Sequence, residues 1–376
     1  MKVVCISCFD YYDTRMFWVI KYFRKKGFET RYLITDFDHF SKTNAVRNYP
    51  DSKQLHVPAY FKNLSLRRLM SHYIFSKSVV KELKIEKPDI IYCVVPPNSL
   101  VKGVAGYKRK NPDCKVVFDI YDMWPESFPY AKNNPVLNIF FNLWRKLRDK
   151  YICSADILTG VSRHQKEELD AMYHMDTKVI FPRIADEESV IPSYSFDIDG
   201  GISFLYLGNI NHITDIELGT ELLAGIAEST EVTLHIIGEG QNRDTWVQML
   251  NAAGVKTICY GAVFDAEKKR EIFGKCQLGL NIPRQAINSS MALKSVEYMH
   301  LGLPFVNSGT GDNKEIAEKE NLGINIDRDN LSDTIERIKN LSCDDLIKMH
   351  QNSINFYKSA FSEQDYDSIF DEILHR

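Results

Sequence analysis

The sequence predicts an α/β protein built from two doubly wound domains. Short apolar runs alternate with helical patterns along almost the whole chain, as in βαβ units around a parallel sheet. This alternation breaks once, at residues 185–201, which are polar, contain Pro and Gly and show no period. The 376 residues are also enough for two domains with sizeable cores.

The first series of elements is expected within residues 1–185. Its strands are continuously apolar, which is typical of buried parallel strands, and we expect them at 2–7, 29–34, 90–95, 116–120 and 157–161. Apolar residues at helical spacing predict helices between the strands, at about 14–26, 66–83, 100–110 and 136–151. Gly27 follows the first helix directly and is a usual stop residue.

The second series is expected within residues 202–355, after a linker at 186–201. Its strands are predicted at 203–207, 232–237, 256–260, 278–282 and 304–306, with helices near 215–228, 242–253, 265–275, 291–301 and 312–320. An amphipathic helical tail follows, and its last part, 356–376, is expected to be able to cross back to the first domain. Both domains are Rossmann-like. Two such domains facing a cleft would line it with strand carboxyl ends, where ligands bind in these sheets.

Charge divides the chain in the same way. Residues 1–190 carry 31 Lys and Arg against 22 Asp and Glu, a net charge of +9, while residues 191–376 carry 16 against 28, a net charge of −12. Halves of opposite sign indicate two domains with different partners, one of which can be an acidic surface.

The compartment is expected to be the cytoplasm. The most apolar stretch, 135–144, is too short to span a bilayer and contains two Asn, and the N-terminus does not resemble a signal peptide. Eight cysteines fit reduced thiols. Cys5 and Cys8 have the spacing of a metal or redox pair, but no second pair follows, so buried strand-end residues are the favoured interpretation.

The strongest constellation lies in residues 281–308. A helix is expected to start at about Met291, after a polar loop, so its free N–H groups and dipole favour a bound phosphate. Ser290 can cap the helix or donate its hydroxyl, and Lys294 lies one turn further on. Glu297 shares a face with Lys294 and suits the hydroxyls of a ribose. A capped surface helix with solvated Lys and Glu is an equally good interpretation of this spacing alone.

The residues from Glu297 to Pro304 (EYMHLGLP) resemble the nucleotide-sugar motif of GT-B fold glycosyltransferases, particularly the retaining family 4 (glycosyl transferases group 1). The resemblance implies that Glu297 holds the donor ribose. It also implies that the backbone of Met291, Ala292 and Leu293 contacts the diphosphate. The motif's first Glu would fall at position 289, where this chain has Ser, and this leaves the sugar and the stereochemical outcome open.

Further landmarks of the family follow in the expected order. Residues 204–208 resemble the first strand and glycine loop of the donor domain, so Gly208 and the following Asn209 are assigned to the donor site. An Arg and a Lys that usually face the diphosphate are replaced by Asn209 and Asp215. We therefore expect Lys294 and Arg284 to supply the missing positive charge.

Two stretches of the N-terminal half match as well. Asp13-Thr14-Arg15 resembles an Asp-x-Arg loop that faces the cleft, and residues 118–127 resemble an Asp-x-His-Asp-Leu-Trp-Pro-Glu segment. Asp122, Asp13 and Arg15 are thus the catalytic candidates. Asp122 and Glu126 have the alternative of capping the following turn.

The resemblance implies a metal-independent, hexosyltransferase-like enzyme with retaining chemistry, a UDP-sugar as first choice of donor and no cofactor. If the enzyme retains configuration, the leaving phosphate can deprotonate the acceptor; if it inverts, Asp122 is the expected base. Synthesis of surface polysaccharide or another glycoconjugate is the expected setting. A nucleotide-sugar epimerase of the same fold and a catalytically weak partner subunit remain alternatives.

Two basic and aromatic runs, 62–87 and 140–151, mark the first half. Such helices can lie on an anionic membrane, and the acceptors of the resembled family are often linked to lipid. We therefore expect a glycan or lipid-linked acceptor and peripheral contact with the inner face of the membrane. Nucleic acid is not expected, since no recognition motif is present.

Overall fold

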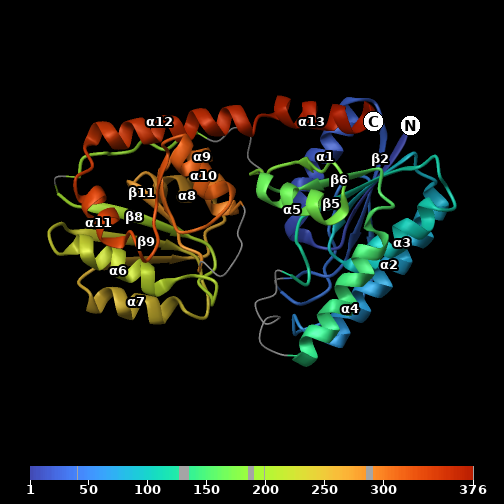
Figure 1. The fold of residues 1–376 in the computed structure, drawn as a ribbon, viewed down its shortest axis with the longest axis horizontal. Coiled ribbons are helices and arrows are strands. Elements are labelled where there is room, and N and C mark those ends of the chain that lie inside the picture. Colours follow the sequence, from blue (N-terminus) through green and yellow to red (C-terminus); the bar gives the residue numbers. More distant parts are fainter. Residues whose placement is uncertain (40, 127–134, 185–189, 199, 285–290, 376) are drawn as a thin grey trace. The chain divides into compact units, whose positions relative to one another are not determined.

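The computed structural model describes residues 1–376 except 40, 127–134, 185–189, 199, 285–290 and 376 (Figure 1). The chain divides into two compact units. The first comprises Met1–Phe181 together with Tyr366–Arg376, and the second comprises Pro182–Asp365.

The first unit contains a parallel sheet of seven strands in the order β3-β2-β1-β4-β5-β6-β7. Its strands are β1 (Lys2–Ser7), β2 (Glu29–Thr35), β3 (Ser52–Leu55), β4 (Ile90–Val95), β5 (Lys115–Ile120), β6 (Ile157–Gly160) and β7 (Lys178–Val179). Its helices are η1 (Asp10–Tyr12), α1 (Asp13–Lys25), α2 (Leu66–Glu86), α3 (Asn98–Lys108), α4 (Pro135–Ile152) and α5 (Arg163–Tyr173). Strand β4 is buried along its whole length, as its unbroken apolar sequence predicts.

The direction of strand addition reverses between β1 and β4, which pair in parallel with Val3 opposite Ile90. Because strand crossovers are right-handed, helices before and after this reversal cover opposite faces of the sheet. Helices α2, α3 and α4 lie together in Figure 1. Loops that follow β1 and β4 leave the sheet at this switch point, which is where doubly wound sheets bind ligands.

The second unit contains a parallel sheet of six strands in the order β10-β9-β8-β11-β12-β13. Its strands are β8 (Ile202–Leu207), β9 (Val232–Ile237), β10 (Lys256–Gly261), β11 (Leu278–Asn281), β12 (Phe305–Asn307) and β13 (Gly323–Asn325). Its helices are α6 (Ile216–Ala227), α7 (Arg243–Ala252), α8 (Ala266–Phe273), α9 (Leu293–Leu301), α10 (Asp312–Lys319), α11 (Leu331–Lys339) and α12 (Cys343–Ala360). Its switch point lies between β8 and β11.

The last helix, α13 (Glu363–His375), belongs mainly to the first unit. Phe370 is buried in the first core, with its ring centroid 5.0 Å from that of Tyr22 on α1. Lys25 of α1 forms a salt bridge of 2.6 Å with Asp367. The return to the first unit begins at Tyr366, ten residues after the start of the expected C-terminal segment, because α12 stays with the second unit until Ala360.

The predicted α/β class with two doubly wound domains is confirmed. Three strands were not predicted: β3 is polar, β7 has two residues and β13 contains Gly and Asn, so none shows a long apolar run. Cys5 and Cys8 are buried, and burial raises the pKa of the Cys5 thiol to about 12. This agrees with strand-end core residues.

Among the described residues, no helix has the length and apolar character that a membrane span requires. In the same part of the chain, no His, Cys, Asp and Glu side chains gather in a group of three that could hold a metal ion.

Candidate functional site

Three glycines build a tight backbone platform at the carboxyl ends of β8, β9 and β10. Gly208 has φ +119° and Gly238 has φ +152°, values that other residues rarely adopt. A Cβ atom on Gly238 would lie 1.9 Å from the carbonyl oxygen of Gly208. The N–H of Gly208 donates to the carbonyl of Ile237, and that of Gly238 donates to Gly261, both at 2.9 Å. Glycine is therefore required for the two loops to pack this closely; Gly238 is buried in this contact, whereas Gly208 is partly exposed and lies next to Lys294.

Lys294 reaches this platform from the first turn of α9. Its Nζ lies 4.1 Å from the centroid of the Tyr206 ring and would be 3.6 Å from a Cβ on Gly208. In the part of the chain that the structure describes, Lys294 makes no ion pair or hydrogen bond. Among the described residues its neighbours at the platform are therefore an aromatic ring and glycine backbone, and its contact with an anion stays a prediction. The side chain of Asn209, which follows the platform, is exposed.

The N-terminus of α9 is the second feature beside this platform. The helix begins at Leu293, and its N-cap residue, Ala292, provides no side-chain hydrogen bond to the first amides. Met291 is buried, whereas Leu293 is half exposed. Within the described part of the chain, the backbone N–H groups of this first turn thus have no side-chain cap, and uncapped groups of this kind are suited to an anion. Ser290, a predicted donor-site residue, lies outside the described residues, as does Ser289.

Glu297 does not behave as a solvated surface carboxylate. Its Oε1 lies 2.5 Å from the Nζ of Lys269 on α8, and only 16% of its side chain is exposed. Lys294 and Glu297 come from the same helix, with Lys294 one turn nearer the N-terminus. Glu297 is therefore an ion-paired carboxylate and not a solvated one, and its binding of a ribose stays a prediction.

Arg284 is placed differently from the expectation. Its Nη2 lies 2.6 Å from Glu217 of α6, and its Nε donates to the carbonyl of His212 at 3.2 Å. Asp215 caps α6 by accepting a hydrogen bond from the N–H of Leu218. As a carboxylate, it does not supply the positive charge that a Lys would bring to the platform. The charge of Arg284 is thus compensated by Glu217, one of the many acidic residues of the second unit. Lys294 remains the better-placed of the two predicted cations.

In the first unit, Asp122 follows β5 and lies beside α1 and α2. The hydroxyl of the buried Tyr12 donates a hydrogen bond to it. Burial raises the pKa of Asp122, while the Tyr12 hydrogen bond and the positive charge of Arg68 oppose that rise. Arg68 lies over the ring of Trp124, 4.2 Å from its centroid. Asp122 is thus a half-buried carboxylate that Tyr12 holds in place near a cation.

Asp13 and Arg15 are turned toward the interior. The two carboxylate oxygens of Asp13 accept hydrogen bonds from Tyr32 at 2.6 Å and Tyr49 at 2.7 Å. Arg15 is 5% exposed, and its Nε lies 3.3 Å from Asp119, which is fully buried. These partners occupy both side chains, so the geometry gives them a structural role. Their predicted catalytic role finds no support in these contacts.

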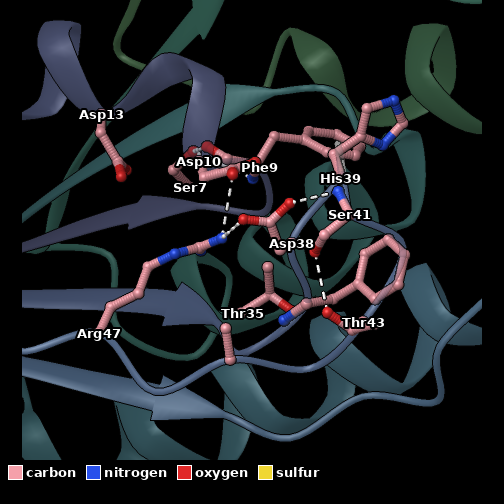
Figure 2. Close-up of polar contacts among 12 residues, drawn as sticks. Ser7, Phe9, Asp10, Asp13, Thr35, Asp38, His39, Ser41, Thr43 and Arg47 are labelled. Atoms are coloured by element: carbon pink, nitrogen blue, oxygen red, sulfur yellow. Dashed lines mark hydrogen bonds and ion pairs between the residues drawn. The ribbon is translucent and has the colours of Figure 1, made fainter. Parts of the chain in front are cut away.

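A polar cluster after β1 and β2 was missed at the level of sequence (Figure 2). Arg47 lies 2.9 Å from Asp10 and 3.4 Å from Asp38, and Asp38 accepts from the N–H of Ser41 at 2.8 Å. Burial raises the pKa of Asp10. The sequence signal that could have indicated this cluster is the presence of Asp10 and Asp38 after the first two strands. The cluster places hydrogen-bonding groups at the carboxyl edge of the first sheet.

Glu126 proves to be a structural partner and not a free site residue. It receives two hydrogen bonds from Arg148 of α4, at 2.6 and 3.0 Å, and Arg148 is completely buried. Arg148 also donates to the carbonyl of Trp124 at 3.0 Å. The pair therefore fastens the segment after β5, including Asp122, to α4.

Comparisons with known proteins agree with this architecture. Residues 15–185 match the family model described as Glycosyltransferase Family 4, and residues 201–344 match Glycosyl transferases group 1. A search of curated proteins found no match.

Among solved structures, the chain is similar to the lipopolysaccharide outer core galactosyltransferase WaaB in its apo form, with 15% identity, 96% of this chain and 100% of that one covered, and a TM-score of 0.64. It is also similar to HepE of Anabaena in complex with UDP, with 14% identity, full coverage of both chains and a TM-score of 0.69. For sucrose-phosphate synthase of Thermosynechococcus elongatus the identity is 12%, the coverage 100% of this chain and 98% of that one, and the TM-score 0.70.

Two doubly wound units, each matched by a glycosyltransferase family model, define the class. The chain belongs to the glycosyltransferases of the GT-B fold. Its first unit carries the Family 4 match and its second unit the group 1 match.

Proposed function

We propose that this glycosyltransferase uses a nucleoside diphosphate sugar, with a UDP-sugar as first choice, and transfers the sugar to a hydroxyl of a glycan or lipid-linked acceptor. The setting would be the synthesis of surface polysaccharide or another glycoconjugate. The observation that carries the donor assignment is Lys294: its ammonium group lies at the glycine platform beside the first turn of α9, and among the described residues it has no carboxylate partner and that turn has no side-chain cap. HepE, which shares the fold, has been solved with UDP.

On the donor side, each group has a distinct task. The amides at Ala292 and Leu293, the dipole of α9 and Lys294 would bind the diphosphate and stabilise the negative charge that develops when it leaves. Gly208 would let the phosphates approach the backbone. Glu297 would accept hydrogen bonds from the ribose hydroxyls. None of these tasks requires a metal ion, which supports metal-independent transfer.

On the acceptor side, Asp122 is the leading candidate. In a retaining reaction it would orient the acceptor hydroxyl while the leaving phosphate takes the proton. In an inverting reaction it would act as the base. Burial raises the pKa of Asp122, which suits a base, while the hydrogen bond from Tyr12 and the charge of Arg68 oppose that rise.

The first unit also offers a surface for an anionic membrane. On α2, the residues Leu66, Met70, Tyr73, Lys77, Lys81 and Lys84 follow one another at helical spacing and are all exposed. On α4, Ile139, Leu143, Lys146 and Lys150 repeat this arrangement. We call these two rows the α2–α4 stripes. Each has exposed apolar side chains toward the N-terminal end and lysines toward the C-terminal end, which suits peripheral binding to lipid head groups.

The stripes are narrower than the two basic and aromatic runs suggested. Phe75, Phe141 and Trp144 are buried in the first core, and Arg68 and Arg148 are buried as well. These five side chains cannot contact a lipid surface. The proposed membrane contact therefore rests on the exposed residues of the stripes alone.

A thermal-shift screen followed by calorimetry tests the donor assignment. UDP, GDP, ADP, TDP, CMP and their sugars would be compared, and UDP is expected to raise the melting temperature most. Lys294→Met should weaken binding of the preferred nucleotide at least about tenfold, since a charge-assisted contact is lost. Lys268→Met is the matched control, because Lys268 is exposed on α8. Failure of every nucleotide to bind would contradict the proposal.

A partner subunit without its own donor is the second candidate. Arg284 is neutralised by Glu217, and Asp215 stands where the resembled family has a Lys, so the donor site has fewer cations than expected. This candidate predicts no nucleotide binding by the chain, which the same screen measures.

A further inference from the structure

We propose that Lys269 is a positioning residue for the donor nucleotide, which holds the carboxylate of Glu297 in place to receive the ribose hydroxyls. The inference rests on the proposed function and adds a residue to it. Neither the sequence pattern nor the family motif singled out Lys269, which lies on a different helix from Glu297.

The contact itself is short and shielded. The Nζ of Lys269 lies 2.5 Å from Oε1 of Glu297, and the two side chains are 23% and 16% exposed. Exposed surface pairs hold their geometry poorly, because each side chain loses rotamer freedom in forming them. A pair with most of its surface covered is screened less and keeps a defined orientation.

The two helices that carry this pair are fastened to each other and to the sheet. Tyr298, next to Glu297, is fully buried, and its hydroxyl donates to a strand carbonyl and accepts from the N–H of Leu207 at 3.1 Å. Its ring centroid lies 6.0 Å from that of Phe273, one helical turn after Lys269 on α8. The spacing between α8 and α9 is thus set by core packing, and the salt bridge forms across a rigid frame.

This frame leaves part of the carboxylate for a ligand. Among the described residues, Lys269 makes the one hydrogen bond that Glu297 receives, and it uses Oε1. An ionised carboxylate has about four lone-pair positions, so Oε2 can still accept from a ribose hydroxyl. Preorganised acceptors lose less conformational entropy on binding than mobile ones. Lys269 would therefore raise the contribution of the ribose hydroxyls to nucleotide affinity without touching the nucleotide.

The test is a thermodynamic cycle that combines a substitution in the protein with the removal of one hydroxyl from the ligand. Calorimetry measures the affinities of UDP and 2′-deoxy-UDP for the wild-type chain, Lys269→Met, Lys269→Arg and Lys268→Met. Loss of a ribose hydroxyl should weaken binding to the wild-type chain about tenfold to a hundredfold, as for a hydrogen bond to a charged group. In Lys269→Met the same loss should cost less than about threefold. Lys269→Arg should keep most of the wild-type ratio, and Lys268→Met all of it.

A merely structural role for Lys269 gives a different pattern. Lys269→Met would then lower the melting temperature and weaken both nucleotides alike, leaving their affinity ratio at the wild-type value, and this result would overturn the inference. If the screen identifies another base, the corresponding nucleotide and its 2′-deoxy form replace UDP. Absence of any nucleotide binding by the wild-type chain would instead contradict the proposed function, and with it the role of Lys269.

Discussion

Both units have charged residues near the carboxyl ends of their strands, but the surroundings of these residues differ. In the first unit, Asp13 and Arg15 follow β1 and are enclosed by Tyr32, Tyr49 and Asp119. In the second unit, Lys294 lies beside the loop after β8 and has an aromatic ring as its neighbour but no carboxylate among the described residues. The first arrangement stabilises a fold, and the second leaves charge for a ligand.

Under the proposed function, this difference would let an acidic half bind an anionic donor. The residues from 191 onward have a net charge of −12, and their acids neutralise nearby cations such as Arg284 and Arg328. For the proposed donor, a cation close to the bound phosphates would matter more than the net charge of the whole domain. Exposed charges that lie beyond a Debye length of about 8–10 Å are largely screened.

The largest effect is expected from breaking an enclosed pair. Arg148→Met should lower the free energy of unfolding by about 3–4 kcal/mol, because it removes a buried cation, its bonds to Glu126 and its bond to the carbonyl of Trp124. Urea unfolding measures the loss. Glu126→Gln is the control and should cost about 1 kcal/mol, since the Glu126 side chain is 30% exposed. Equal, small losses in both variants would show that the pair does not fasten this segment.

The donor side should respond in binding and not in folding. Glu297→Ala should weaken nucleotide binding by about 2–4 kcal/mol if the ribose hydrogen bonds are charge-assisted. The melting temperature without ligand should change little by comparison. Calorimetry with the preferred nucleotide measures the effect, with Glu271→Ala on the exposed face of α8 as the matched control. Unchanged affinity in Glu297→Ala would remove Glu297 from the site.

The pH dependence of stability tests whether the Asp13 carboxylate is buried in the folded chain. Burial raises its pKa to about 6 from an unfolded value of 3.8, so the native state binds the proton more tightly than the unfolded chain. Stability attributable to Asp13 therefore rises as the pH falls from 7 to 4, by about 2–3 kcal/mol in total. As the pH falls from 7 to 4, the unfolding free energy of the wild-type chain minus that of Asp13→Asn should increase by this amount.

Urea unfolding at several pH values between 4 and 7 gives that difference directly. Asp113→Asn, at an exposed position, should leave the pH dependence unchanged. A flat difference for Asp13→Asn would mean that Asp13 titrates in the folded chain as it does in the unfolded one, and that burial does not raise its pKa above what the tyrosine hydrogen bonds offset.

The fold was largely predictable because its signal is local. Buried parallel strands are apolar along their length, so β1 and β4 appear in the sequence with correct bounds. Strands such as β3 and β13 are defined by pairing at a sheet edge, which no local pattern reports. The helix α9 begins two residues later than expected, because Ala292 takes an extended N-cap conformation.

The site was predictable only where one helix carries it. Lys294 and Glu297 were found because their spacing along α9 fixes their relation. Lys269 and Tyr12 were missed, since their partners lie 28 and 110 residues away in the sequence. Asp13 and Arg15 were expected to face a ligand because of their resemblance to a loop motif, but tyrosines from β2 and the following loop enclose Asp13.

The smallest effect concerns the α2–α4 stripes, where charge is fully exposed in the first unit. Lys81→Ala should weaken binding to vesicles that contain anionic lipid by about 1 kcal/mol, roughly fivefold, and the effect should fade as salt rises. Leu66→Ser removes an apolar side chain that is 81% exposed and should weaken binding independently of salt. Lys256→Ala in the second unit is the matched control for the charge. If the chain does not bind anionic vesicles, or if Lys81→Ala and Lys256→Ala have the same effect, the lysines of the stripes are solvated charges without a membrane role.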